Sequence, residues 1–65
     1  MKNIRIQARE MGHTVVGALK RLPDDEYKQH GEIVIARVYA DNEGVTYWVD
    51  WHGKLLTIAG EDWCI

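Results

Sequence analysis

The chain has 65 residues, 46% of them hydrophobic and 28% charged, a net charge of −2 and a single Cys. This length suits one domain that buries about 60% of its unfolded surface, and the composition is too apolar for a disordered chain. A lone Cys excludes an internal disulfide and favours the reducing cytoplasm. Without a signal peptide or a run of roughly 20 apolar residues, we expect one soluble domain over residues 1–65.

Charge is distributed unevenly along the chain. The first 21 residues carry five Lys or Arg and one acid, a net charge of +4. Residues 22–65 carry three Lys or Arg and nine acids, a net charge of −6. This asymmetry is the most informative global feature for function, since each half suits a partner of opposite charge.

The first half of the chain gives three element predictions. Residues 2–8 alternate apolar and polar side chains, which favours a strand over a helix. Residues 14–22 fit a strand, with a helix as the alternative. Residues 23–31 predict a short helix, because Pro23 suits a first helical turn and Gly31 suits a C-terminal cap, the alternative being an acidic loop.

The second half predicts an antiparallel meander. Runs over 32–40, 45–51 and 54–58 are rich in β-branched and aromatic residues. Asp41-Asn42-Glu43-Gly44 supplies the first turn, and the two-residue turn His52-Gly53 would pair Trp51 with Lys54. The run over 54–58 is apolar on both sides, which predicts a central or covered strand. Alternation predicts these inward side chains: Val45, Tyr47, Val49 and Trp51.

These elements predict a small, mainly β domain. We expect a twisted antiparallel sheet or open barrel of about five strands with one short helix, and residues 63–65 docked on the sheet. If residues 14–22 are helical, the class becomes α+β.

Catalytic and metal chemistry find little support in the sequence. No zinc-type spacing joins the candidate soft ligands, which are His13, His30, His52 and Cys64. The Cys64 thiol lies between Trp63 and Ile65 and follows two acids, surroundings that do not activate a thiolate. Adjacent acids at a helix start or turn are normally capping and solvating groups. We therefore expect no catalysis, no metal and no cofactor.

Single-stranded nucleic acid is one candidate ligand. Small β-barrels bind it by stacking bases on aromatic side chains beside a basic groove. The aromatic candidates are Tyr39, Tyr47, Trp48 and Trp51, and the basic ones are Arg5, Arg9, Lys20, Arg21 and Arg37. The net charge of −2 and the acids near the aromatic hairpin oppose this interpretation.

The sequence favours a basic protein surface as the partner. The acids of the second half would form a rim around Trp48, which would anchor the interface if exposed. We expect a monomer whose partner-binding residues are Asp24, Asp25, Glu26, Asp41, Glu43, Trp48, Asp50, Glu61 and Asp62.

In overall character the chain resembles small accessory proteins of phages and mobile elements. The resemblance rests on its size, its lone Cys and the acidic stretches Pro23-Asp24-Asp25-Glu26, Asp41-Asn42-Glu43, Asp50 and Glu61-Asp62. Among such proteins, anti-CRISPR and other host-defence inhibitors present carboxylates where a nucleic-acid-binding machine expects phosphates. The resemblance implies an inhibitor that acts by local DNA mimicry in a host cytoplasm.

Overall fold

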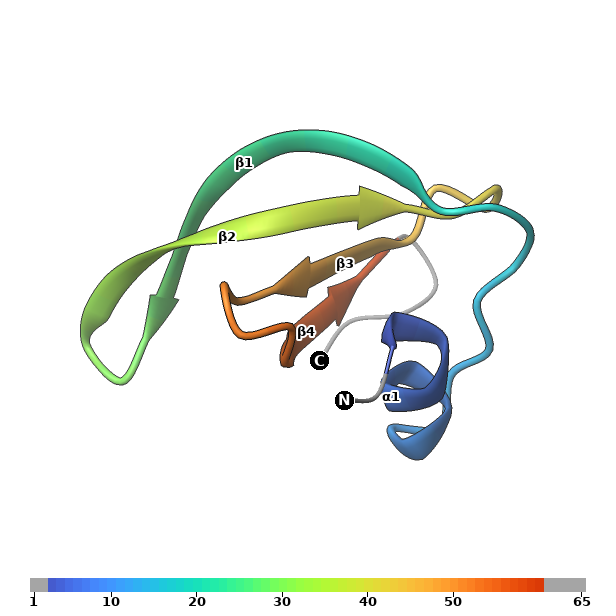
Figure 1. Cartoon of the computed structure of the whole chain (residues 1–65), viewed down its shortest axis with the longest axis horizontal. Coiled ribbons are helices and arrows are strands. Elements are labelled where there is room, and N and C mark those ends of the chain that lie inside the picture. Colours follow the sequence, from blue (N-terminus) through green and yellow to red (C-terminus); the bar gives the residue numbers. More distant parts are fainter. Residues whose placement is uncertain (1–2, 61–65) are drawn as a thin grey trace.

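The computed structural model describes residues 3–60 and contains one helix and one antiparallel sheet of four strands. In chain order the elements are α1 (Ile4–Glu10), β1 (Lys20–Gln29), β2 (Glu32–Ala40), β3 (Thr46–Val49) and β4 (Leu55–Ala59). Neighbouring strands follow the order of the chain, so the sheet is a meander with β1 and β4 at its edges (Figure 1). The small, mainly β antiparallel fold is confirmed, with four strands among these residues where we expected about five.

The N-terminal segment is a helix, so the strand predicted over residues 2–8 is wrong. Asn3 caps α1, because its side-chain oxygen accepts a hydrogen bond from Ile6 N at 2.9 Å. Helical spacing turns Ile4 and Ala8 to the core, and Ala8 is fully buried. Ile6, which a strand would place beside them, is 47% exposed.

The connection from α1 to β1 is irregular. Residues 14–19 form neither the strand nor the helix that their pattern allows, and only residues 20–22 of that stretch belong to β1. Gly17 has φ +77° and lies so close to Asn42 that a Cβ atom would clash with the Asn42 side chain. The path of this connection therefore depends on a distant turn, which local periodicity does not encode.

β1 continues through residues 23–29, so the short helix predicted there is wrong. The register of β1 against β2 shifts between Leu22 and Asp25, which places Pro23 in a bulge. β1 is also an edge strand, so the missing N–H of Pro23 removes no hydrogen bond from the centre of the sheet.

A two-residue turn joins β1 to β2. His30 and Gly31 both have positive φ, 52° and 82°, as a type I′ hairpin turn requires. Gly31 therefore serves this turn and not a helix cap. The resulting hairpin is long and curved, and its tip extends beyond β3 and β4 (Figure 1).

The predicted meander is confirmed in outline and corrected at its second turn. Val45, Tyr47 and Val49 are buried, as their alternation indicated. β3 ends at Val49, which pairs with Leu55, so residues 50–54 replace the predicted two-residue turn. The fourth inward prediction is wrong, since Trp51 lies in this turn and is 56% exposed.

The two faces of the sheet differ. We call the inner face the one on which Arg37 pairs with Val49 and Tyr39 pairs with Tyr47. The main core lies there, packed beneath α1, and consists of Ala8, Val15, Val45, Tyr47, Val49, Leu55 and Ile58. The outer face carries Val38 opposite Trp48.

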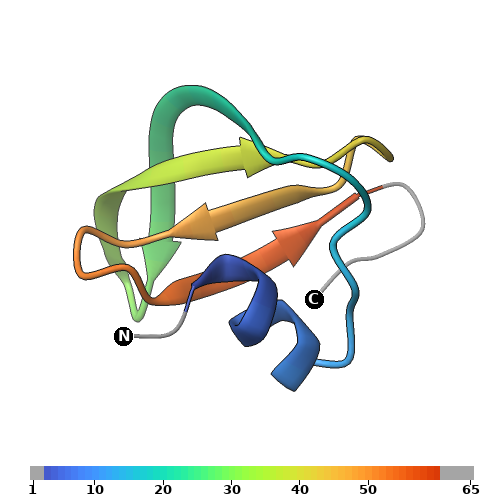
Figure 2. The same cartoon turned by 45° about the vertical axis from the view of Figure 1, so that its right-hand side comes forward.

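α1 lies beside β4 and covers the inner face at that edge (Figure 2). The run over 54–58 therefore forms an edge strand that a helix covers, and it is not central. The predicted docking of residues 63–65 lies outside the described residues. Among residues 3–60, no helix has the length and apolar character needed to cross a membrane.

Candidate functional site

Arg37 on β2 is a partly buried charged residue at the inner face. Its guanidinium carbon lies 4.4 Å from the centroid of the Trp51 ring, a stacked cation–π geometry. Within residues 3–60, its buried Nε atom has no hydrogen-bond partner and no carboxylate pairs with the guanidinium. The side chain is only partly buried and lines a pocket, so the Nη groups are the donors that an acceptor outside the chain can use.

Trp51 is held out toward solvent by the turn that contains it. Asp50 Oδ1 accepts hydrogen bonds from His52 N and Lys54 N, both at 2.9 Å, and Asp50 N donates to Lys54 O at 2.9 Å. This closed turn keeps the Trp51 ring at the surface while Arg37 stacks on it. An exposed indole beside an arginine is a surface on which a flat group can stack.

Tyr39 and Arg21 form a second stacked pair on the inner face. The register places Arg21 opposite Tyr39, and its guanidinium carbon lies 5.5 Å from the Tyr39 ring centroid. Arg21 also forms an ion pair with Asp24, with 2.7 Å between Nη2 and Oδ1. The positive charge of Arg21 is thus partly offset, whereas that of Arg37 is not.

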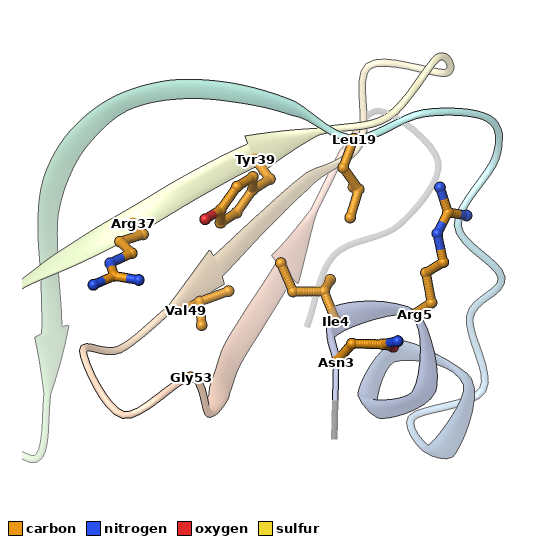
Figure 3. Close-up of a pocket in the computed structure, with 8 residues that line it drawn as sticks. All are labelled: Asn3, Ile4, Arg5, Leu19, Arg37, Tyr39, Val49 and Gly53. Atoms are coloured by element: carbon orange, nitrogen blue, oxygen red, sulfur yellow. The ribbon is translucent and has the colours of Figure 1, made fainter. Parts of the chain in front are cut away.

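A pocket of about 360 Å³ opens between α1 and the inner face (Figure 3). Arg37 lies on one side of this pocket and Arg5 and Asn3 lie on the other, with apolar side chains between them (Figure 3). Its lining residues are Asn3, Ile4, Arg5, Leu19, Arg37, Tyr39, Val49 and Gly53.

The polar groups of this pocket are mostly hydrogen-bond donors. Asn3 Oδ1 already accepts from Ile6 N, which leaves the Asn3 amide nitrogen for a ligand. The Gly53 carbonyl accepts from Gln7 Nε2 at 2.8 Å. Arg5 donates one bond to the Gly17 carbonyl, which positions its guanidinium. Since no described acid lines the pocket, its chemistry suits an acceptor-rich or anionic ligand.

The predicted acidic residues that the structure describes lie on several different elements. Asp41 is buried, and Asp24 is paired with Arg21. Asp25 and Glu26 are exposed on β1, while Glu43 and Asp50 lie in two different turns. Trp48 is half-buried on the outer face, where its ring centroid lies 6.1 Å from that of Tyr27. Glu61 and Asp62 lie outside the described residues.

Asp41 has a structural task that explains its burial. Its Oδ1 accepts from Glu43 N and Val45 N, and its Oδ2 accepts from the Tyr47 hydroxyl at 2.7 Å and from Val16 N at 3.3 Å. Burial raises the pKa of Asp41, but these hydrogen bonds outweigh it and hold the pKa below its ordinary value. Burial and the bond to Asp41 raise the pKa of Tyr47, which therefore remains a donor.

His13 extends this network without forming a metal site. Its Nε2 lies 2.8 Å from the Tyr47 hydroxyl oxygen. Within residues 3–60, no three His, Cys, Asp or Glu side chains are grouped in a way that could hold a metal ion. Cys64, the fourth of the candidate ligands, lies outside that range.

The chain matches no known family. Comparisons with protein families, with curated proteins and with solved structures found no significant similarity. Function must therefore be argued from the site itself.

Sequence reasoning named some members of this site as nucleic-acid candidates, but it missed Asn3 and Gly53 and did not predict the assembly. Arg37 and Tyr39 are two residues apart on β2, so strand alternation places them on one face, as the register shows. Arg5 lies on a helix, Arg21 on another strand and Trp51 in a turn. Their positions at the inner face depend on the packing of α1 and on the length of the 50–54 turn. One feature of the sequence could have predicted that Trp51 is exposed: the side chain of Asp50, which favours a longer turn.

Proposed function

We propose that this protein is a non-enzymatic binding module that takes single-stranded nucleic acid across its inner face. Bases would stack on Trp51 and Tyr39, and phosphates would meet Arg37, Arg5 and Arg21. The observation that carries this proposal is the Arg37 guanidinium, which stacks on an exposed indole, lines the pocket and has no ion pair within residues 3–60.

A single strand suits this surface better than a duplex. Single-strand binders combine a basic groove with aromatic rings, and each stacked base contributes about 1–3 kcal/mol. Paired bases in a duplex hide the flat faces that such rings recognise. The net charge of −2 does not exclude binding in the pocket, because none of the pocket-lining residues is acidic.

The test is a fluorescence anisotropy titration of a labelled oligonucleotide in low salt. We expect saturable binding by the wild-type protein and a loss of about tenfold or more in Arg37→Gln, since a charge-assisted hydrogen bond contributes about 1.5–3 kcal/mol. Lys28→Gln is the control, because it also removes one positive charge, from an exposed residue of β1 that does not line the pocket. Equal affinities for the two variants would contradict the proposal.

An acidic docking surface is the second candidate. Asp25 and Glu26 are exposed on the edge strand β1, and neither forms an ion pair within residues 3–60. They would engage a basic partner, as an anti-CRISPR-like inhibitor acting by local DNA mimicry would. Replacing both by Ser should then weaken capture of a basic nucleic-acid-binding protein and leave oligonucleotide affinity unchanged.

Under either candidate we propose a monomer that works in the cytoplasm, the host cytoplasm if a phage encodes it. The single Cys is the basis for this compartment.

A further inference from the structure

We infer that the pocket between α1 and the inner face receives one nucleotide with a phosphate on each side of its base. This inference rests on the proposed function and names the unit of the strand that the pocket recognises. It follows from the order of the lining groups, which runs from donors through an apolar floor to donors again (Figure 3).

The first phosphate belongs on the Arg37 side. The planar guanidinium offers a fork of N–H groups that matches two phosphate oxygens. Stacking on Trp51 holds this fork in place, and no carboxylate within residues 3–60 pairs with it. A phosphate would supply the acceptors for the Nη groups, whereas an apolar ligand would not.

The second phosphate belongs on the Arg5 and Asn3 side. Arg5 is positioned by its bond to the Gly17 carbonyl and keeps further N–H groups for a ligand. The Asn3 amide nitrogen has no partner within residues 3–60, since the capping bond uses only Oδ1. These side chains supply donors alone, so they suit an anion.

The middle of the pocket suits a flat, apolar ring. Ile4, Leu19 and Val49 form its apolar surface, and the Tyr39 ring projects among them (Figure 3). A volume of about 360 Å³ lies at the lower end of the range for small-molecule pockets, which is about 300–1,000 Å³. The pocket therefore suits one base at a time.

The test uses four small probes: adenosine, its 5′- and 3′-monophosphates, and adenosine 3′,5′-bisphosphate. Calorimetric titration in low salt should show that each phosphate tightens binding about tenfold, with the bisphosphate the tightest. A bisphosphate that binds no better than both monophosphates would overturn the inference.

Two substitutions test which side of the pocket binds each phosphate. Arg37→Gln should remove the gain from one phosphate, and Asn3→Asp should remove the gain from the other, because it replaces the amide donor by an anionic oxygen. Asp is as good a helix cap as Asn, so α1 should keep its stability. Lys28→Gln, which removes a positive charge outside the pocket, should change neither gain. If Asn3→Asp binds the bisphosphate as the wild type does, the assignment is wrong.

The probes also separate this inference from the proposed function. Oligonucleotide binding without any preference for the bisphosphate would reject the two-phosphate pocket and keep the binding module. Bisphosphate binding without oligonucleotide binding would reject the strand-binding function and leave a small-molecule site. Binding of neither would reject both.

Discussion

Asp41 connects the β2–β3 turn to the segment that precedes β1. One carboxylate accepts hydrogen bonds from three backbone N–H groups and from the Tyr47 hydroxyl. Four bonds compensate for burying the charge, which would otherwise be costly. The residue that looked like part of an acidic surface is therefore a support for the fold.

Tyr47→Phe should lower the free energy of unfolding by about 1.5–3 kcal/mol, because it removes a hydrogen bond to a buried charge. Tyr27→Phe is the control and should cost less than about 0.5 kcal/mol, because the Tyr27 hydroxyl makes no hydrogen bond within residues 3–60. Urea unfolding measures both. Equal costs would contradict the network described for Asp41.

Acid should weaken the fold through Asp41. The pKa of Asp41 in the folded protein lies below the ordinary value of about 3.9. The ionised carboxylate therefore stabilises the fold fully above a pH of about 3.9, and this stabilisation is lost as the pH falls through the lower pKa of the folded state. Asp41→Asn should be less stable at pH 7 and should lose less free energy of unfolding between pH 5 and 2. Parallel pH profiles for the two proteins would contradict this assignment.

Asp24→Asn separates the two candidate functions by the sign of its effect. It releases Arg21 from the 2.7 Å ion pair, so oligonucleotide affinity should rise roughly two- to fivefold. The acidic-surface candidate predicts weaker capture of a basic partner by the same variant. Unchanged oligonucleotide affinity in the anisotropy titration would remove Arg21 from the binding face.

At the scale of elements, the β1–β2 hairpin offers a test of its turn. His30 has φ 52°, a conformation that Asn adopts more readily than His. His30→Asn should therefore raise the free energy of unfolding by roughly 0.5–1 kcal/mol. Gly31→Ala should lower it, because Gly31 also has positive φ, 82°. A destabilised Asn variant would contradict the type I′ turn.

The sequence predicted the elements whose residues fit only one periodicity. Val45, Tyr47 and Val49 alternate along a strand, and all three are buried. α1 was missed because its apolar residues fit both a strand, as Ile4-Ile6-Ala8, and a helix, as Ile4-Ala8. Seven residues are too few for the helical pattern to prevail without knowledge of the packing against the sheet.

The other failures have a tertiary cause. Pro23 and the acids after it match the start of a helix, yet a bulge in an edge strand accommodates the same residues. The pocket draws on α1, β2, β3, the connection before β1 and the 50–54 turn. No sequence window contains all of these, so neither the pocket nor the Arg37–Trp51 stack could be read from spacing alone.

At the scale of the whole molecule, three arginines lie at the inner face, although the net charge is −2. Arg5 and Arg37 line the pocket, and Arg21 stacks on Tyr39. Three phosphate contacts predict that the logarithm of the association constant falls with the logarithm of salt concentration at a slope of about −2. Anisotropy titrations between 50 and 300 mM salt measure this slope, and a slope near zero would contradict phosphate recognition.

The most direct measurement of the proposed binding face is a ¹H–¹⁵N NMR titration with a short single-stranded oligonucleotide. Binding at the inner face predicts that the Arg37 Nε–H and Trp51 indole N–H signals shift together in low salt. The Trp48 indole N–H, on the outer face, should stay in place. Shifts confined to the β1 residues Asp25 and Glu26, or no shifts at all, would contradict it.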